Sequence, residues 1–138
     1  MAFTTEINNE ILTTKMCDSC IFCKRDKDII CENEYALAFY DSYPVSKGHV
    51  LIIPKRHIET YFDLSEEEMV SFFKLSKEVK RIIDEKYSPD GYNVGFNIGE
   101  YGGQSVMHCH MHIIPRYKGD VENPRGGIRG VIPNKKNY

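Results

Sequence analysis

The sequence predicts an α+β fold in which a mainly antiparallel sheet packs against one long helix. One amphipathic segment with helical spacing, Ser65 to about Lys86, occupies the middle of the chain. Short apolar or alternating segments, typical of strands, lie on both sides of it. With 138 residues, the chain has room for one domain and for a core that needs no disulfides.

Composition narrows the class of protein. The 18 basic and 20 acidic side chains give a net charge of −2, without the basic excess that nucleic-acid coating requires. The longest aliphatic run, Val50 to Ile53, is too short to cross a bilayer, and residues 1–10 show no signal-peptide pattern. Five cysteines, an odd number, favour reduced thiols over a disulfide framework. We therefore expect a cytoplasmic protein with neither nucleic-acid nor membrane partners.

Two strands are expected before the helix. Residues 1–16 are polar and aperiodic, which predicts a flexible N-terminal arm. Tyr35 to Tyr40 is apolar and aromatic, and His49 to Ile53 is rich in β-branched residues, so both segments are predicted strands. Pro44 and Gly48 mark the loop between them.

The predicted helix begins with a capping box, in which Ser65 and Glu68 each satisfy a backbone amide of the first turn. It ends before the turn at Ser88-Pro89-Asp90-Gly91. Positions spaced by three or four residues form one face that we expect to pack against the sheet: Met69, Phe72, Phe73, Ser76, Val79, Ile82 and Ile83.

Two alternating segments follow the helix. Tyr92 to Asn97 predicts a strand, and a loop at Gly99–Gly103 leads to a second alternating run, Gln104 to Pro115. In a strand, alternate residues share a face and their α-carbons lie about 6.6 Å apart. One face of this run then carries His108, His110 and His112, and the core-facing side carries Cys109, Met111 and Ile113.

The residues alone leave several interpretations open. The histidine face could be a solvated edge strand, part of a metal site, or a site where a neutral imidazole attacks phosphorus or a carbonyl. Cys20-x-x-Cys23 could be half of a zinc site, a redox pair or a coincidence. The redox interpretation is disfavoured, because no thioredoxin-type strand-to-helix context surrounds these cysteines.

The segment His108-Cys109-His110-Met111-His112-Ile113-Ile114 is similar to the His-φ-His-φ-His-φ-φ signature of the histidine-triad (HIT) superfamily of nucleotide hydrolases and transferases. The resemblance implies the HIT-like fold, with about five strands, over residues 17–117. Further blocks at compatible spacing extend it over most of the chain: Cys20-Ile21-Phe22-Cys23, Phe39-Tyr40-Asp41, Gly48 to Ile58, Asn97, and Gly102-Gly103-Gln104-Ser105.

The resemblance implies roles for the polar residues. His110 corresponds to the family's nucleophile, which attacks the α-phosphorus and forms a nucleotidyl-histidine that water hydrolyses. His112 corresponds to a histidine that binds phosphate oxygens, and Gln104 and Ser105 to phosphate-contacting positions, with Ser105 near the leaving group. A neutral imidazole suits this role, because it attacks without first losing a proton.

The resemblance also implies a nucleoside site. Asp41 corresponds to a position that binds ribose hydroxyls, although an aspartate before Pro44 could also cap the turn. Asn97 and Gly103 correspond to positions near the phosphates, where a glycine permits close backbone approach. Four residues correspond to the base pocket, with an ordinary core role as the alternative: Ile21, Phe22, Phe39 and Leu51.

The branch of the family that carries Cys-x-x-Cys completes a structural zinc site with two histidines. The corresponding set here is Cys20, Cys23, His57 and His108, which implies one zinc ion per chain. His49 is expected to be a hydrogen-bonded structural residue. Cys17 and Cys31 receive no role, although Cys17 could compete for the metal.

Residues 118–138 form a basic C-terminal extension of the same domain. Its Gly and Pro content is typical of a solvated coil, but its cations could instead reach the distal phosphates of a polyphosphate substrate. Arg125 and Arg129 are the candidates for that contact. The extension favours dinucleoside polyphosphates over nucleoside phosphoramidates as substrates.

Together these features predict a hydrolase that cleaves dinucleoside polyphosphates or nucleoside phosphoramidates at the α-phosphate through His110. A nucleotidyl transferase is the near alternative, and a nucleotide-binding module with little turnover is another. A metal-binding regulator would explain the cysteines but not Gln104, Ser105 or His112. The family resemblance also implies a homodimer formed through the long helix and the adjoining strand.

Overall fold

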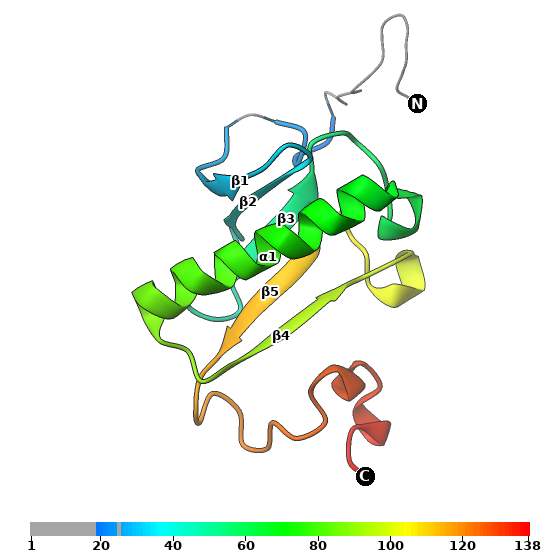
Figure 1. Ribbon diagram of the computed structural model, residues 1–138. Helices are drawn as coiled ribbons and strands as arrows, with labels where there is room; N and C mark the ends of the chain where they lie inside the picture. Colours follow the sequence, from blue (N-terminus) through cyan, green and yellow to red (C-terminus); the bar gives the residue numbers. More distant parts are fainter. Residues whose placement is uncertain (1–18, 25) are drawn as a thin grey trace, which may run out of the picture.

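The computed structural model describes residues 19–24 and 26–138 and confirms the predicted fold class. The expected N-terminal arm, residues 1–16, lies outside this range. A five-stranded sheet has the order β1-β2-β3-β5-β4, with every neighbouring pair antiparallel (Figure 1). The strands are β1 (Ile29–Glu32), β2 (Ala36–Tyr40), β3 (Val50–Pro54), β4 (Gly91–Phe96) and β5 (Met111–Arg116).

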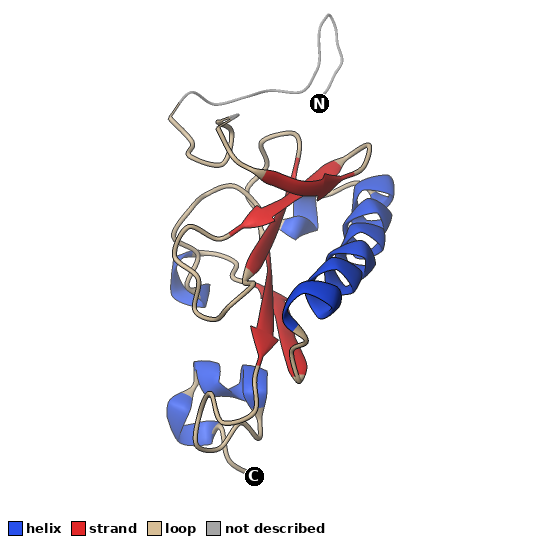
Figure 2. Cartoon of the chain, turned by 90° about the vertical axis from the view of Figure 1, so that its left-hand side faces the viewer, coloured by secondary structure: helices blue, strands red, loops and turns tan. Residues whose placement is uncertain are grey.

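One long helix, α1 (Glu66–Tyr87), covers one side of the sheet, and the loops that carry the candidate site lie on the other side (Figure 2). The core between helix and sheet includes Ile52, Phe72, Val79 and Met111, each nearly inaccessible to solvent. A second cluster on the opposite face contains Leu37, Phe39, Leu51 and Ile53, with Phe22 packed against it. The sheet is therefore apolar on both faces.

The N-terminus of α1 follows the predicted capping box. The Ser65 hydroxyl accepts a hydrogen bond from the Glu68 amide, and the Glu68 carboxylate accepts one from the Ser65 amide. Arg56 adds a bidentate ion pair to the same carboxylate, at 2.7 and 2.9 Å. The start of the helix is thereby tied to the loop after β3. Among the described residues, no helix is long and apolar enough to span a membrane.

The buried face of α1 is narrower than predicted. Leu75, which was not assigned to it, is buried, whereas Phe73 and Met69 are 60% and 37% exposed. Only one edge of the helix meets the sheet, so the stripe Phe72, Leu75, Val79 and Ile83 is buried and its flanks are not. The result is an exposed apolar surface on the outer side of α1.

Two strand predictions need correction. The short edge strand β1 was not anticipated, because Ile29–Glu32 lacks a clear alternation. The run predicted as a strand from Gln104 becomes β5 only at Met111. The pairing with both neighbours begins there: β4 stops at Phe96, opposite Met111, and β3 pairs with β5 only as far as Met111, although β3 itself continues to Pro54. His108 and His110 therefore precede the strand, although Cys109 and Met111 still point into the core.

Candidate active site and metal centre

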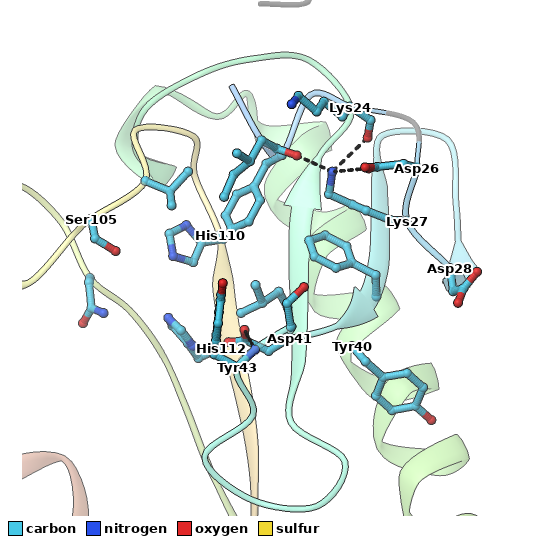
Figure 3. A pocket seen from close by; sticks show the side chains of 17 residues that line it. Lys24, Asp26, Lys27, Asp28, Tyr40, Asp41, Tyr43, Ser105, His110 and His112 are labelled. Atoms are coloured by element: carbon cyan, nitrogen blue, oxygen red, sulfur yellow. Dashed lines mark hydrogen bonds and ion pairs between the residues drawn. The ribbon is translucent and has the colours of Figure 1, made fainter. Parts of the chain in front are cut away.

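A cavity of about 720 Å³ opens on the side of the sheet away from α1 (Figure 3). The structure brings all but two of the predicted catalytic and substrate-binding residues to its wall. The apolar part consists of Ile21, Phe22, Phe39 and Leu51, and the polar part includes Asp41, Asn97, Ser105, His110 and His112. An apolar pocket with a few convergent polar groups is the usual form of a small-molecule site.

His110 lies at the end of the extended segment that leads into β5, and only 7% of it is exposed. Its Nδ1 lies 2.8 Å from the His108 carbonyl oxygen. Because a carbonyl can only accept, Nδ1 carries the proton of the neutral ring, and Nε2 keeps its lone pair. The backbone thus fixes the tautomer in which Nε2 is the nucleophilic atom.

His112 has the opposite tautomer, set by a chain of hydrogen bonds. The Val45 amide donates to His49 Nδ1 at 3.1 Å, so the His49 proton is on Nε2. That N–H faces His112 Nδ1 at 3.0 Å and the Asp41 carboxylate at 3.4 Å. His112 therefore accepts on Nδ1 and carries its own proton on Nε2, which is buried and has no hydrogen-bond partner among the described residues. A buried N–H without a partner is a binding position for an anionic oxygen.

Burial keeps these imidazoles uncharged. Desolvation, together with repulsion by His110 and His49, lowers the pKa of His112 to about 4. Desolvation also lowers the pKa of His49, while the nearby Asp41 carboxylate opposes this effect. At neutral pH His49 and His112 are therefore uncharged, with defined donor and acceptor atoms.

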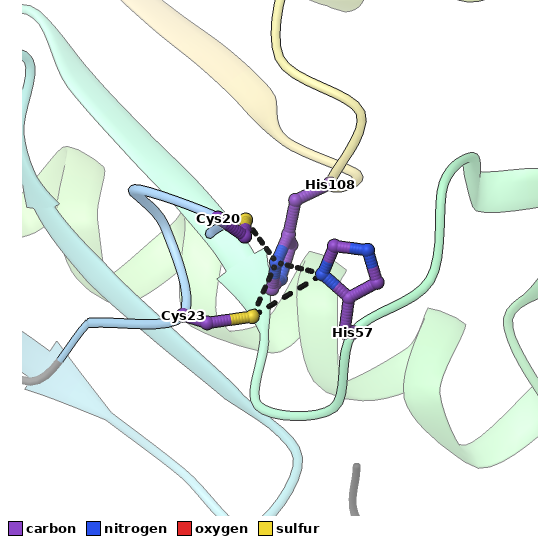
Figure 4. A group of neighbouring side chains, drawn as sticks. All are labelled: Cys20, Cys23, His57 and His108. Atoms are coloured by element: carbon purple, nitrogen blue, oxygen red, sulfur yellow. Dashed lines mark hydrogen bonds between the residues drawn. The ribbon is translucent and has the colours of Figure 1, made fainter. Parts of the chain in front are cut away.

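The four predicted metal ligands converge beside this cavity (Figure 4). Cys20 and Cys23 lie at the two ends of a tight turn, in which the Cys23 amide donates to the Cys20 carbonyl at 3.1 Å. His57 follows β3 and His108 precedes β5. A hydrogen bond from the Cys109 amide to the Ile58 carbonyl, at 2.7 Å, holds these two segments together.

The geometry of this cluster fits a tetrahedral ion. A zinc ion with two thiolates and two imidazoles requires about 3.3 Å between nitrogens and about 3.6 Å between nitrogen and sulfur. The two Nδ1 atoms of His57 and His108 are 3.2 Å apart, and His108 Nδ1 lies 3.5 Å from each sulfur. His57 Nδ1 lies 3.2 Å from Cys23 Sγ. These four distances fit a tetrahedral ion, and all four ligand atoms lie within 4.8 Å of one another, so the cluster could hold a metal.

The tautomer of His108 also suits metal binding. Its Nε2 donates to the Pro54 carbonyl at 3.1 Å, which leaves the Nδ1 lone pair facing the two sulfurs. Burial lowers the pKa of His108 to about 4, so this lone pair is available at neutral pH.

Gln104 and Gly103 are the two predicted site residues that do not line the cavity. The Gln104 amide group donates to the Glu59 and Val106 carbonyls and accepts from the Gly99 amide, so its hydrogen bonds fasten two loops. Gly103 has φ +93°, a conformation that favours glycine, and packs against the Asn97 side chain. Their contact with phosphate stays a prediction.

The sequence did not indicate several cavity residues. His49 was expected to be structural, and the structure shows that its hydrogen bond reaches His112. His49 itself does not line the cavity, whereas Lys24, Lys27 and Tyr43 do. Lys27 Nζ donates to the carbonyls of Ile21 and Lys24, at 2.5 and 2.8 Å. No motif marked these positions, and only their proximity to Cys20-x-x-Cys23 or Asp41 could have suggested them.

The basic extension does not reach the cavity. Arg125 and Arg129 stack on the Tyr138 ring, with guanidinium carbons 5.1 and 4.7 Å from its centroid. Arg129 also donates to the carbonyls of Lys135 and Lys136. Neither arginine lines the cavity, so within one chain these cations interact with the extension itself.

An antiparallel sheet with alternate histidines before and within one central strand, beside a partly buried Cys₂His₂ cluster, defines a histidine-triad protein. Residues 24–119 match the family described as "HIT domain", and the chain belongs to this family. It is 46% identical to the protein hit of Bacillus subtilis, over 75% of each chain.

Two relatives have names that state an activity. The chain is 45% identical to adenosine 5'-monophosphoramidase hnt1 of Schizosaccharomyces pombe, over 71% of this chain and 74% of the relative. It is 35% identical to bis(5'-adenosyl)-triphosphatase of Dictyostelium discoideum, over 72% and 66%.

Solved structures share the fold. A HIT family protein from Bacillus anthracis superposes with a TM-score of 0.70 at 39% identity, covering 75% of this chain and 77% of its own. A histidine-triad family protein from Mycobacterium smegmatis, described as zinc-bound, gives 0.68 at 32% identity, covering 76% and 80%.

Proposed function

We propose that this protein is a nucleotide hydrolase that cleaves at the α-phosphate through a nucleotidyl-histidine on His110. The observation that carries this proposal is the pair of opposite tautomers on the cavity wall. His110 presents a lone pair on Nε2, while His112 presents an N–H that has no partner among the described residues. A nucleophile beside a phosphate-oxygen donor is the arrangement that phosphoryl substitution requires.

The chemistry proceeds in two steps. His110 Nε2 attacks the α-phosphorus, a P–N bond forms, and the bond to the leaving group breaks as that group departs with its electron pair. His112 Nε2–H donates to a non-bridging oxygen, where negative charge increases in the transition state. An amine leaving group takes up a proton from solvent. Water then attacks the phosphorus and loses a proton to solvent, the P–N bond breaks with its electron pair returning to His110 Nε2, and the nucleoside monophosphate is released. Ser105 and Asn97 line the cavity where the leaving group would lie.

The apolar wall of the cavity would hold the base and Asp41 the ribose. Asp41 Oδ1 accepts from the Tyr43 amide at 2.9 Å, and Oδ2 lies 3.4 Å from His49. The carboxylate therefore caps the turn, as one interpretation of the sequence expected, and it retains lone pairs that would accept from ribose hydroxyls. The names of two relatives refer to adenosine compounds, whose base an apolar wall would accommodate.

Nucleoside phosphoramidates and dinucleoside polyphosphates both fit this mechanism, because they differ only in the leaving group. The relatives' names include one enzyme of each kind. The sequence argument for dinucleotides rested on Arg125 and Arg129, which stack on Tyr138 and do not line the cavity. We therefore include both substrate classes in the proposal.

Zinc is the metal that the Cys₂His₂ cluster suits best, with one ion per chain in a structural role. Two thiolates and two imidazoles complete a closed tetrahedral shell, which leaves no open position for a substrate or water. The zinc-bound relative from Mycobacterium smegmatis supports this assignment.

A homodimer is the proposed assembly. Met69, Val70 and Phe73 on α1 are 37%, 48% and 60% exposed, and Val94 on the edge strand β4 is 46% exposed. Apolar groups on an unpaired edge and an adjacent helix favour a second copy as partner. Phe73→Glu should therefore yield monomers, as measured by sedimentation velocity, whereas Lys77→Glu on an exposed position of the same helix should not. A monomeric wild-type protein would contradict the proposal.

The hydrolase proposal is tested by turnover. Wild-type protein and His110→Ala are compared on adenosine 5'-phosphoramidate, diadenosine triphosphate and diadenosine tetraphosphate. We expect hydrolysis of at least one substrate by the wild type and its loss in the variant. Equal rates for the two proteins would overturn the mechanism. A rapid acid quench should also trap adenylylated wild-type protein but not the variant.

A further inference from the structure

We propose that the metal centre builds the base-binding wall of the cavity, so that metal and nucleoside each strengthen the binding of the other. Phe22 is the positioning residue that transmits this coupling. The proposal rests on the proposed function in one respect, because it takes the ligand of the cavity to be a nucleoside phosphate.

The first observation is that two of the four apolar wall residues lie between two metal ligands. Ile21 and Phe22 are the two residues enclosed by the Cys20–Cys23 turn, and both line the cavity. This turn belongs to no helix or strand of the fold. Bonds from Cys20 and Cys23 to one ion would fix both ends of the turn, and hence the positions of the two side chains between them.

The second observation is that Phe22 contacts the groups on each side of it. Its ring centroid lies 5.0 Å from that of His110 and 6.1 Å from that of His108, both edge to face. It also lies 5.7 Å from Phe39 on the opposite part of the wall. One ring therefore touches a metal ligand, the proposed nucleophile and the base pocket.

The third observation is the environment of Lys27. Its ammonium group donates to the carbonyls of Ile21 and Lys24 and lies over the rings of Phe22 and Phe39, at 5.9 and 5.4 Å. These interactions require the turn to stay close to the sheet. A turn released by loss of the metal would disrupt them and move the apolar wall.

A competing route would couple the metal to the phosphate instead. The His108 carbonyl accepts from His110 Nδ1 at 2.8 Å, so movement of His108 could disturb the nucleophile directly. The two routes are distinguished by fragments of the nucleotide. Coupling through Phe22 requires the base, whereas coupling through His108 requires the phosphate.

The test measures equilibrium metal binding in competition with a chromogenic zinc chelator. Zinc-loaded full-length protein is titrated with the chelator alone, or with saturating AMP, adenosine or ribose 5-phosphate. AMP and adenosine should raise the apparent zinc affinity about tenfold, within the usual range for coupled sites. Ribose 5-phosphate should leave it unchanged. Thermodynamic linkage requires that zinc raise the affinity for AMP by the same factor as AMP raises the affinity for zinc. This factor is the ratio of the AMP affinities of zinc-loaded and zinc-free protein.

A pair of variants tests the role of Phe22. Phe22→Ala should keep its zinc and lose most of the coupling between zinc and AMP binding. If circular dichroism shows that the alanine variant folds poorly, Phe22→Leu takes its place. Asp41→Asn is the control, because this residue lines the same cavity but lies outside the turn. It should weaken AMP binding while AMP still raises the zinc affinity by the wild-type factor.

The outcomes separate this inference from the proposed function. If AMP binds zinc-loaded protein but leaves the zinc affinity unchanged, the coupling is wrong and the hydrolase proposal stands. If ribose 5-phosphate is as effective as AMP, the route through Phe22 is wrong. If AMP does not bind the zinc-loaded protein at all, both proposals fail.

Discussion

His108 and His110 lie two residues apart in one extended segment, yet their rings have opposite tautomers. His108 is protonated on Nε2 by its bond to the Pro54 carbonyl and directs Nδ1 to the cysteines. His110 is protonated on Nδ1 by its bond to the His108 carbonyl and keeps the Nε2 lone pair. The comparison shows that one backbone acceptor at each ring decides whether an imidazole suits a metal or a phosphorus atom.

The largest expected effect comes from removing the proposed nucleophile. His110→Ala should lower kcat/KM at least about a thousandfold, because no other described side chain on the cavity wall presents a comparable nitrogen lone pair. Its zinc content should equal that of the wild type. If His110→Ala lost both zinc and activity, His108 could not bind the metal independently of His110, contrary to what their tautomers indicate.

Removing His108 should primarily affect zinc binding, whereas removing His110 should primarily affect activity. His108→Ala deletes one of four ligands, so native mass spectrometry should detect about one zinc per wild-type chain and none in the variant. We expect a loss of several kcal/mol in unfolding free energy, since structural metal binding contributes directly to folding. Wild-type protein that is folded and metal-free would contradict the zinc assignment.

A smaller effect is expected at His49, which sets the tautomer of His112. His49→Phe removes the N–H that His112 Nδ1 accepts, and should lower kcat about 10- to 100-fold, as for other residues that orient a functional imidazole. The KM should change less than kcat. An unchanged kcat with a normal KM would show that His112 does not depend on this hydrogen bond.

The smallest effect is on the pH dependence of stability. The pKa of His112 is about 4 in the folded protein and about 6.5 when unfolded, so between these values the unfolded state binds more protons and stability increases with pH. His112→Asn should reduce this slope by less than the limit of about 1.4 kcal/mol per pH unit, because the folded and unfolded states differ by less than one bound proton at this ring. Chemical unfolding of both proteins at pH 5 and 6.5 in excess zinc measures this slope. A slope that is the same in the variant and the wild type would contradict the lowered pKa of His112.

Local patterns were sufficient for much of the fold. Ser65 and Glu68 defined the start of the helix, and the alternation of Cys109, Met111 and Ile113 identified the core-facing side of the histidine segment. Such patterns depend on neighbouring residues only. The exposed Phe73 and the unpredicted strand β1 could not be inferred in this way, because both depend on which element lies opposite.

The same distinction applies to the site. Resemblance at the level of sequence brought together Cys20, Cys23, His57 and His108, and the structure places them within one ligand cluster. The assignment of Gln104 to phosphate came from its motif and stays a prediction, and the bonds of its amide group to backbone atoms of two loops were not foreseen. Side-chain type and spacing therefore indicated which residues gather, and not what each one bonds to.

The sequence by itself determined the fold class, the capped helix and the order of histidines along one segment, since periods of two and of three to four residues are local properties of the backbone. Only the tertiary structure decided what each imidazole can do. The acceptor that fixes His108 is 54 residues away in the chain, and the donor that fixes His112 is 63 residues away. Proton positions on these rings follow from such distant contacts, which no local pattern encodes.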